Sequence, residues 1–214
     1  MTGKIKLVHS GGNSVSVAVP TNAPSASEVE FKLPQADGSS GQALVTDASG
    51  NLSFAGTGKI LQVIQTVKKD KTTIQSASLT DITGMSVTIT PSSASSKVLI
   101  RYSLSVFTTS SDQYWAMRLV RGSDSTIFIG DQGSNSNQTR SSFGSYMSSY
   151  VDGRNITQEL LDSPNTTSAT TYKLQAHTPY SASYTIGINN SPQNDNYSYM
   201  STMVSTITAM EVAA

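Results

Sequence analysis

The sequence predicts an all-β protein, and three observations point to that class. Serine and threonine make up 62 of the 214 residues, whereas charged residues make up only 13%. Threonine suits strands because its branched Cβ packs on a pleated surface, and the scarcity of lysine and glutamate disfavours long surface helices. Apolar and polar residues alternate in many short runs, as in Ser14–Val19 and Met85–Thr90, which is the period of a half-buried strand.

Residues 1–57 are expected to form a β module that buries little within one chain. Gly11-Gly12-Asn13 and several prolines break this region into short runs, because glycine and proline favour turns over regular structure. The expected strands are Lys4–Val8, Ser14–Val19, Val29–Leu33, Gln42–Thr46 and Asn51–Ala55.

The segment from Leu33 to Phe54, LPQADGSSGQALVTDASGNLSF, predicts a tight β-hairpin. Its two turn-rich patches, DGSSG and DASGN, combine glycine with aspartate or asparagine, which tolerate turn conformations and bond nearby backbone. The hairpin has almost no apolar core of its own, so we expect it to be stable only when packed on neighbouring repeats or on other chains. Residues 1–57 are therefore interpreted as an oligomerisation module.

Residues 58–214 are expected to form an antiparallel β-sandwich, because eight or nine longer and more apolar strands follow at regular spacing. A jelly roll, another sandwich or a barrel all fit this pattern. Residues 155–162 are compatible with a helix, a strand or an irregular loop, and residues 133–142 and 189–198 are expected to be exposed loops. The expected strands lie at 60–67, 85–90, 98–106, 115–120, 127–129, 142–150, 172–177, 184–188 and 203–212. The last of these carries apolar residues on both faces, as a central or subunit-contact strand does.

Three parts of the chain resemble bacteriophage virion proteins, particularly fibre and appendage proteins of marine and cyanobacterial phages. The resemblance covers most of the chain and is carried by GKIKLVHSGGNSVSVAVP with FKLP, by the hairpin segment, and by GKILQVIQTVKKD, SVTITPSSASSKVLI, LDSPNTTSATTYKLQ and TITAMEVA. It implies a homotrimer, assembled in the host cytoplasm and located in the virion. It also implies that the N-terminal module attaches to tail or capsid proteins while a jelly-roll-like C-terminal domain faces outward.

Composition argues against several other classes of protein. The formal net charge is zero and the chain has no cysteine, which speaks against nucleic-acid binding by clustered basic residues and excludes disulfides and thiolate chemistry. No apolar run approaches the roughly 20 residues that span a bilayer. No cofactor motif is present, and the Asp- and Asn-containing loop at 193–196 lacks the calcium-loop pattern, so we expect neither cofactor nor metal.

Catalytic residues are not evident from the sequence. The two histidines, His9 and His177, lie far apart, and no G-x-S-x-G motif occurs, so a Ser–His–Asp triad is not expected. We expect His177 to be a surface or strand-end residue. Carboxylates such as Asp112, Asp131, Asp152 and Asp195 lie mostly in turn contexts, which does not favour the carboxylate pair of a glycosidase.

Tyrosines are the remaining candidates for a binding surface. Tyrosine offers a flat apolar face with a polar edge, suited to sugar stacking and protein contacts. The candidate contacts to a host-surface glycan or outer-membrane protein are Tyr197, Tyr199, Tyr180 and Tyr114. Trp115 and Tyr184 are interpreted as ordinary strand packing.

Three alternatives to a host-binding fibre stay open at this point. A capsid decoration protein would stabilise the shell without touching the host. A small glycan-active enzyme would need two carboxylates in one cleft. A lectin-like module would be a monomer that binds sugar without a virion role.

Overall fold

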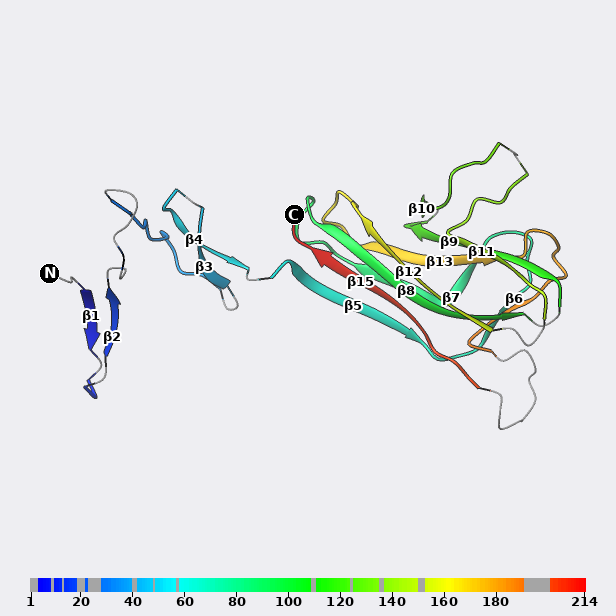
Figure 1. The fold of residues 1–214 in the computed structure, drawn as a ribbon, viewed down its shortest axis with the longest axis horizontal. Helices are drawn as coiled ribbons and strands as arrows, with labels where there is room; N and C mark the ends of the chain where they lie inside the picture. Colours follow the sequence, from blue (N-terminus) through cyan, green and yellow to red (C-terminus); the bar gives the residue numbers. More distant parts are fainter. Residues whose placement is uncertain are drawn as a thin grey trace. The chain divides into compact units, whose positions relative to one another are not determined.

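The computed structural model describes residues 4–8, 10–12, 14–18, 22, 28–39, 42–47, 49–56, 58–108, 111–123, 125–134, 137–149, 153–190 and 201–214. The chain divides into two compact units, Met1–Thr57 and Gly58–Ala214. Every regular element among the described residues is a strand, and the C-terminal unit is a sandwich of antiparallel sheets (Figure 1). The predicted all-β sandwich class is therefore confirmed.

The N-terminal unit contains two antiparallel hairpins. Lys4–Val8 (β1) pairs with Ser14–Ala18 (β2), and Gln42–Thr46 (β3) pairs with Leu52–Gly56 (β4). The unit leaves many apolar side chains exposed, among them Leu7, Val17, Phe31 and Leu33, which are 61–77% accessible. The second hairpin is the one that the sequence predicts, and Leu44 (49% exposed) and Phe54 (37% exposed) agree with its expected lack of a core.

Asp47 builds the turn between β3 and β4. One carboxylate oxygen accepts hydrogen bonds from the backbone N–H groups of Ser49 and Asn51, and the other accepts one from the Asn51 side chain at 2.7 Å. These bonds, the one from the Asn51 side chain foremost, lower the pKa of Asp47 below its ordinary value. Gly50 has a φ of +85°, and a Cβ there would lie 2.4 Å from the Glu30 carbonyl oxygen. The DASGN patch thus forms the turn that its composition predicts.

The C-terminal unit consists of two antiparallel layers. The strands are Ile60–Lys68 (β5), Thr72–Ile74 (β6), Thr80–Ile89 (β7), Lys97–Thr108 (β8), Gln113–Arg121 (β9), Ser125–Phe128 (β10), Phe143–Met147 (β11), Gly153–Asp162 (β12), Thr170–His177 (β13), Ile186–Ile188 (β14) and Ser205–Val212 (β15). One layer has the order β5-β15-β8-β12, in which β14 follows β15 along β8 and pairs in turn with β6. The other has the order β7-β13-β9-β11, with β10 continuing beyond β11 along β9.

This strand order is that of a jelly roll. The chain alternates between the two layers. The strands β5, β8, β12 and β15 lie in the first layer, and β7, β9, β11 and β13 lie in the second. In Figure 1, β15 lies between β5 and β8, which are far from it in sequence. Two such interlocked Greek keys define the jelly-roll sandwich. The C-terminal strand therefore closes the first layer, in the central position that its apolar pattern predicts.

The core lies between the layers and follows the period-two pattern of the strands. Residues 98, 100, 102, 104 and 106 of β8 are at most 1% exposed, and they meet the inward side chains of β7, β9 and β13. Trp115 is 1% exposed and packs on Phe143 with ring centroids 5.5 Å apart. The interpretation of Trp115 as strand packing is thus confirmed.

Glu211 is fully buried on the inner side of β15. Its carboxylate accepts hydrogen bonds from the backbone N–H of Ser92 at 2.7 Å, from the Ser92 hydroxyl at 2.6 Å, and from the Gln62 side-chain amide at 2.6 Å. Burial alone would raise the pKa of Glu211, but these bonds, together with one from Ser96, lower it from 4.5 to about 2. The ionised carboxylate therefore ties β15 to β5 and to the turn before β8.

Two further charged groups fix strand ends. The Lys68 ammonium is buried and donates to Asp70 at 2.7 Å and to the Thr72 hydroxyl at 2.6 Å. Asp162 accepts from Arg121 at 2.8 Å and from the Tyr172 hydroxyl at 2.7 Å. The second set joins the ends of β9, β12 and β13 across the two layers.

Several sequence expectations differ from the structure. Residues 29–33 are not a strand, because in the described chain only Lys32 forms a bridge there, a parallel one with Asn51. Residues 155–162, for which the sequence left a helix, a strand and a loop open, belong to a strand, β12, which pairs with β8 over its whole length. The strand expected at 184–188 begins at Ile186, and the one expected at 142–150 pairs only from Phe143 to Met147. Short β6 lacked an apolar pattern that could reveal it.

Candidate functional site

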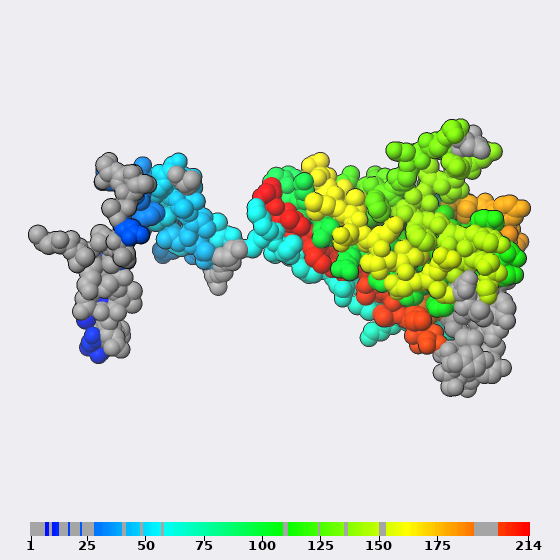
Figure 2. Space-filling view, in the orientation of Figure 1, coloured from blue at the N-terminus to red at the C-terminus, as the bar shows by residue number. Residues whose placement is uncertain are grey.

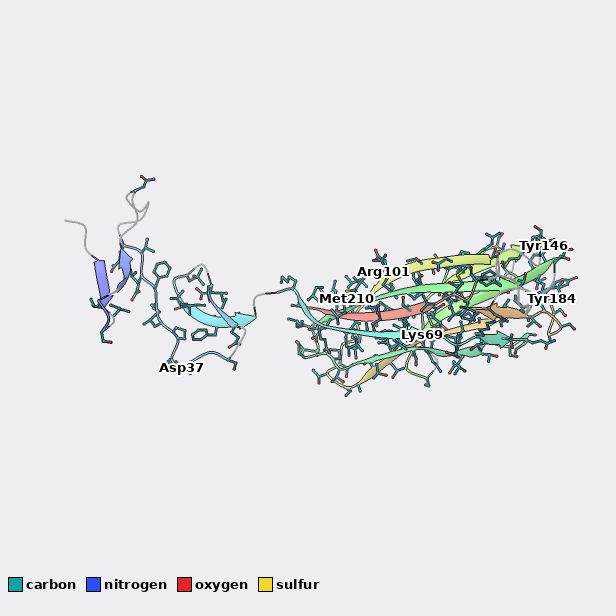
Figure 3. All side chains as sticks on the ribbon, turned by 90° about the horizontal axis from the view of Figure 1, so that it is seen from below. Asp37, Lys69, Arg101, Tyr146, Tyr184 and Met210 are labelled. Carbon is teal, nitrogen blue, oxygen red and sulfur yellow. The ribbon has the colours of Figure 1, made fainter. Side chains whose placement is uncertain are left out.

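Aromatic side chains gather at one end of the C-terminal unit, around a surface hollow of about 530 Å³. Figure 3 shows Tyr146 and Tyr184 at this end of the unit. The side chains that line the hollow are Asp112, Tyr114, Asn137, Thr139, Tyr146, Pro179, Tyr180 and Tyr184. They come from β9, β11, the loops before these two strands, and the segment between β13 and β14.

The first two rings are a cross-strand pair. The register places Tyr114 of β9 directly opposite Tyr146 of β11, and their ring centroids are 4.7 Å apart. Gln113 and Trp115, on either side of Tyr114, are buried, whereas Tyr114 is 47% exposed. Because side chains alternate along a strand, Tyr114 and Tyr146 face outward from the same layer.

The other two rings come from the segment between β13 and β14. Buried Thr178 anchors this segment through its N–H, which donates to the Ser76 carbonyl at 2.8 Å. The Tyr180 ring lies 5.7 Å from Tyr114 and stacks on Tyr184 at 5.9 Å. Tyr146, Tyr114, Tyr180 and Tyr184 therefore form one continuous series of adjacent rings, which we call the tyrosine row.

Asp112 positions one end of the tyrosine row. It adopts a φ of +58°, a left-handed conformation that aspartate tolerates better than most residues. The Tyr146 hydroxyl donates to its carboxylate, and this bond is the main reason that the pKa of Tyr146 rises to about 12. The hydroxyl stays protonated at neutral pH, so the bond holds the ring in place.

The arrangement is suited to binding a ligand that has both apolar faces and hydroxyl groups. Tyr180 is 75% exposed and Tyr146 is 42% exposed, so the aromatic faces are accessible instead of packed away. Asp112, Asn137 and Thr139 place hydrogen-bonding groups around the same hollow. A saccharide ring stacks its C–H face on an aromatic ring and hydrogen-bonds through its hydroxyls, and this hollow offers partners for both.

The hollow does not offer the groups of the usual glycosidase mechanism. Among the described residues that line it, Asp112 is the only carboxylate, whereas that mechanism uses two. Asp152 and Asp195 lie outside the described residues. In the part of the chain that the structure describes, no cluster of three His, Cys, Asp or Glu side chains could hold a metal ion, and no helix is long and apolar enough to cross a membrane.

His177 is not among the residues that line the hollow. It is the last residue of β13, in agreement with the prediction of a strand-end position. It is 8% exposed, its Nδ1 lies 3.0 Å from the Ala77 carbonyl oxygen, and its Nε2 has no hydrogen-bond partner within the described chain. Burial lowers the pKa of His177, and the bond to Ala77 offsets this only in part. The side chain is therefore a neutral, packed imidazole and not part of a triad.

Of the four predicted contact residues, the structure brings Tyr114 and Tyr180 together, while Tyr197 and Tyr199 lie outside the described residues. The sequence did not single out Tyr146, because the β9–β11 register that places it beside Tyr114 is not visible in the pattern. Interpreting Tyr184 as strand packing was wrong, since it precedes β14 and lines the hollow. Clustering of tyrosines near loops was the one sequence signal that pointed here.

The chain has distant likenesses among solved structures. No protein family and no curated protein matches the chain. A structure of infectious bursal disease virus, Gx strain, is 13% identical over 80% of this chain with a TM-score of 0.34, and the crystal structure of that virus's VP2 subviral particle is 12% identical over 80% with a TM-score of 0.32. The chain spans about two fifths of the length of those proteins, 41% and 42%. Likeness of this degree carries no conclusion about function.

Proposed function

We propose that this chain is a non-enzymatic structural component of a phage particle, a homotrimeric tail- or head-fibre protein. Its N-terminal unit binds other virion proteins, and its C-terminal sandwich presents the tyrosine row to a host-surface glycan or outer-membrane protein. The resemblance of its sequence motifs to phage appendage proteins supports the virion role. The exposed tyrosine row is the observation that carries the contact with a host surface.

The N-terminal unit supports the attachment role through what it leaves unburied. Leu7, Val17, Phe31 and Leu33 are each more than 60% exposed. Burying such a side chain completely is worth about 1.5–3 kcal/mol, so a partner that covers several of them adds stability that the hairpins lack alone. Other copies of the chain and a tail or capsid protein are the partners that the proposal assigns to this surface.

The tyrosine row supports host contact because it is both exposed and held in place. Aromatic side chains dominate the binding energy of many protein surfaces, and tyrosine loses little conformational entropy when it binds. The Asp112–Tyr146 bond and the anchored 178–185 segment preorganise the rings, which reduces the cost of ordering them on a ligand. A glycan fits the mixture of ring faces and hydrogen-bonding groups better than a purely apolar partner.

The test is adsorption to the bacteria that the particle infects. We expect Tyr180→Ala and Tyr114→Ala to reduce binding of the full-length protein to these cells about tenfold each, as removal of an aromatic hot spot does. Tyr180→Phe is the matched control, since it keeps the ring and should keep most of the binding. If both alanine variants bound cells as well as the unaltered protein, the host-contact function of the tyrosine row would be refuted.

A capsid decoration protein is the second candidate, because the exposed N-terminal apolar surface fits a capsid partner as well as a tail partner. The two functions predict different defects in particles that lack the protein. Loss of a host-binding fibre should abolish adsorption while heads stay intact. Loss of a decoration protein should leave adsorption normal and lower the temperature at which heads release DNA.

A further inference from the structure

A row of four apolar side chains crosses the outer face of the β5-β15-β8-β12 layer. Val63 pairs with Met210, Met210 with Leu99, and Leu99 with Leu161, so one side chain from each strand lies in line. Val63 is 57% and Leu161 48% exposed, and the two between them are half-buried. In Figure 2 the red atoms of β15 lie uncovered beside the cyan atoms of β5 on this face.

The next two rows along β8, towards Thr108, carry little charge. Their residues are Gln65, Thr208, Arg101 and Glu159 in one row, and Val67, Thr206, Ser103 and Thr157 in the next. Arg101 and Glu159 are the only charged residues among these three rows, they are exposed, and they sit side by side on β8 and β12. Figure 3 shows Arg101 near Met210 of the apolar row. On the other side of the apolar row, Lys97 lies opposite Val212 and is exposed. The face is thus low in charge and rich in apolar and hydroxyl groups.

The outer face of the opposite layer has a different character. Its corresponding row, also one residue from each of four strands, is Ser86, Lys173, Val120 and Thr126. Lys173 forms an ion pair with Asp81 at 2.8 Å, and Val120 is fully buried although it points outward.

The segment between β10 and β11 covers that opposite face from within the chain. Arg118 of β9 donates through Nε to the Arg140 carbonyl at 2.8 Å, and Arg140 donates to the Gly130 carbonyl at 2.9 Å. One layer of the sandwich therefore has its own cover, and the other leaves an apolar row open. A large exposed apolar surface on a folded domain marks an interaction site.

Strand β5 adds an open edge to the same surface. It is nine residues long, ends its layer, and has no proline. Leu61, Val63 and Val67 project from it and are 44–57% exposed. Natural proteins usually protect a long apolar edge with proline, inward charge or a covering segment, because an open edge pairs with other chains. The only lysine of β5, Lys68, is turned inward at the strand's last position.

We propose that this face, the β5-β15-β8-β12 outer surface, binds a second copy of this chain. Two of its charges are self-complementary, since Arg101 of one copy can meet Glu159 of another. The exposed Lys97 lies at the first position of β8, at the end of the face. Four strands spaced about 4.8 Å apart and about eight residues long give roughly 500 Å² per copy, or about 1,000 Å² for two copies, the lower limit of a specific interface. This contact rests on the proposed function, which includes a homotrimer, and it adds which surface joins the copies.

Cysteine cross-linking of the full-length protein tests this contact, because the chain has no cysteine of its own. The variant carries Val63→Cys with Leu161→Cys, which lie about 14 Å apart across three strand spacings and cannot bridge within one chain. The matched control carries Ser86→Cys with Thr126→Cys, the equivalent positions of the opposite layer. Thiol labelling checks that both pairs react, and Trp115 fluorescence checks that both variants are folded.

We expect the first variant to form covalent oligomers at least about tenfold faster than the control under mild oxidation, and its cross-linking to slow when Arg101→Glu is added. Adding Glu159→Arg to that chain should restore the rate. Equal rates for the two cysteine pairs would overturn the proposal, whether both were fast or both slow. Light scattering of the unaltered protein measures its oligomeric mass separately. If only the N-terminal unit held the oligomer together, this mass would still be that of an oligomer, but the cross-link between the β5-β15-β8-β12 faces would fail.

Discussion

Glu211 offers the sharpest test of how the sandwich is held together. Its buried carboxylate accepts three hydrogen bonds of 2.6–2.7 Å from Ser92 and Gln62. Replacing it by glutamine keeps the size of the side chain but removes the charge and turns one oxygen into an NH₂ group. That group can only donate, and it would face groups that already donate. Glu211→Gln should therefore leave at least one buried polar group without a partner.

The magnitude follows from the pKa of Glu211, which falls from 4.5 to about 2 on folding. A difference of about 2.5 units at about 1.36 kcal/mol per unit corresponds to roughly 3 kcal/mol of stabilisation by the ionised form. Ser92 is exposed and Gln62 only half-buried, so solvent screens part of this energy, and we expect Glu211→Gln to destabilise the protein by about 2 kcal/mol at pH 7. Because the folded pKa is the lower one, the stabilisation is fully present above pH 4.5 and is lost as the pH falls towards 2. At pH 3 less than half of it should remain.

Urea unfolding followed by tryptophan fluorescence measures this directly, since Trp115 is the only tryptophan and is buried in the sandwich. Titrations at several pH values between 7 and 3 give the free energy of unfolding of both proteins, and the difference between them isolates Glu211 from other acidic groups. Thr88→Ala on the outer face of β7 is the control, because it removes one exposed hydrogen bond between hydroxyl groups and should shift stability equally at all pH values. A Glu211→Gln difference that stayed constant from pH 7 to pH 3 would refute the reasoning.

Three further outcomes are expected in the same fluorescence assay. Asp70→Asn should destabilise the protein more than Lys68→Met, because the first leaves a buried ammonium without its anionic partner whereas the second replaces it with an apolar chain of similar length. Tyr172→Phe should cost about 2 kcal/mol, since it removes a hydrogen bond to the Asp162 carboxylate. Leu104→Ala should cost about 3 kcal/mol, because Leu104 is fully buried at the centre of β8.

The fold class could be predicted because strands show as a local alternation of apolar and polar residues in the sequence. Met85, Val87 and Ile89 alternate with polar residues, and all three are at most 2% exposed. The DASGN turn was predictable for the same reason, as its bonds span at most four residues. The isolated bridge at Lys32 marks the limit of this reasoning. Residues 29–33 alternate like a strand, but a strand also needs a partner along its length, and pairing is not a local property.

The site could be predicted only as a composition, not as a geometry. The clustering of tyrosines near loops pointed to Tyr114 and Tyr180, which are far apart in sequence and meet at 5.7 Å. Tyr146 joins them through the register of β11 on β9, and Asp112 joins through a bond to Tyr146. Each of these contacts depends on strand order, which alternation does not encode. The same holds for the apolar row, whose four members come from four strands that only the jelly-roll order aligns.

Low charge explains why both proposed binding surfaces of the C-terminal unit are built from rings, aliphatic groups and hydroxyls. The chain has 14 basic and 14 acidic residues, and several of them are used inside the sandwich, where Lys68 and Glu211 are buried. The outer faces carry a few charged residues among many hydroxyl groups, and hydroxyl groups exert no long-range repulsion on a second copy. Association through such faces is neither steered nor screened by long-range charge, so its specificity must come from shape and from the alignment of apolar rows. If both proposals hold, the chain joins copies of itself on one layer and keeps the tyrosine row of the other layer open for a different partner.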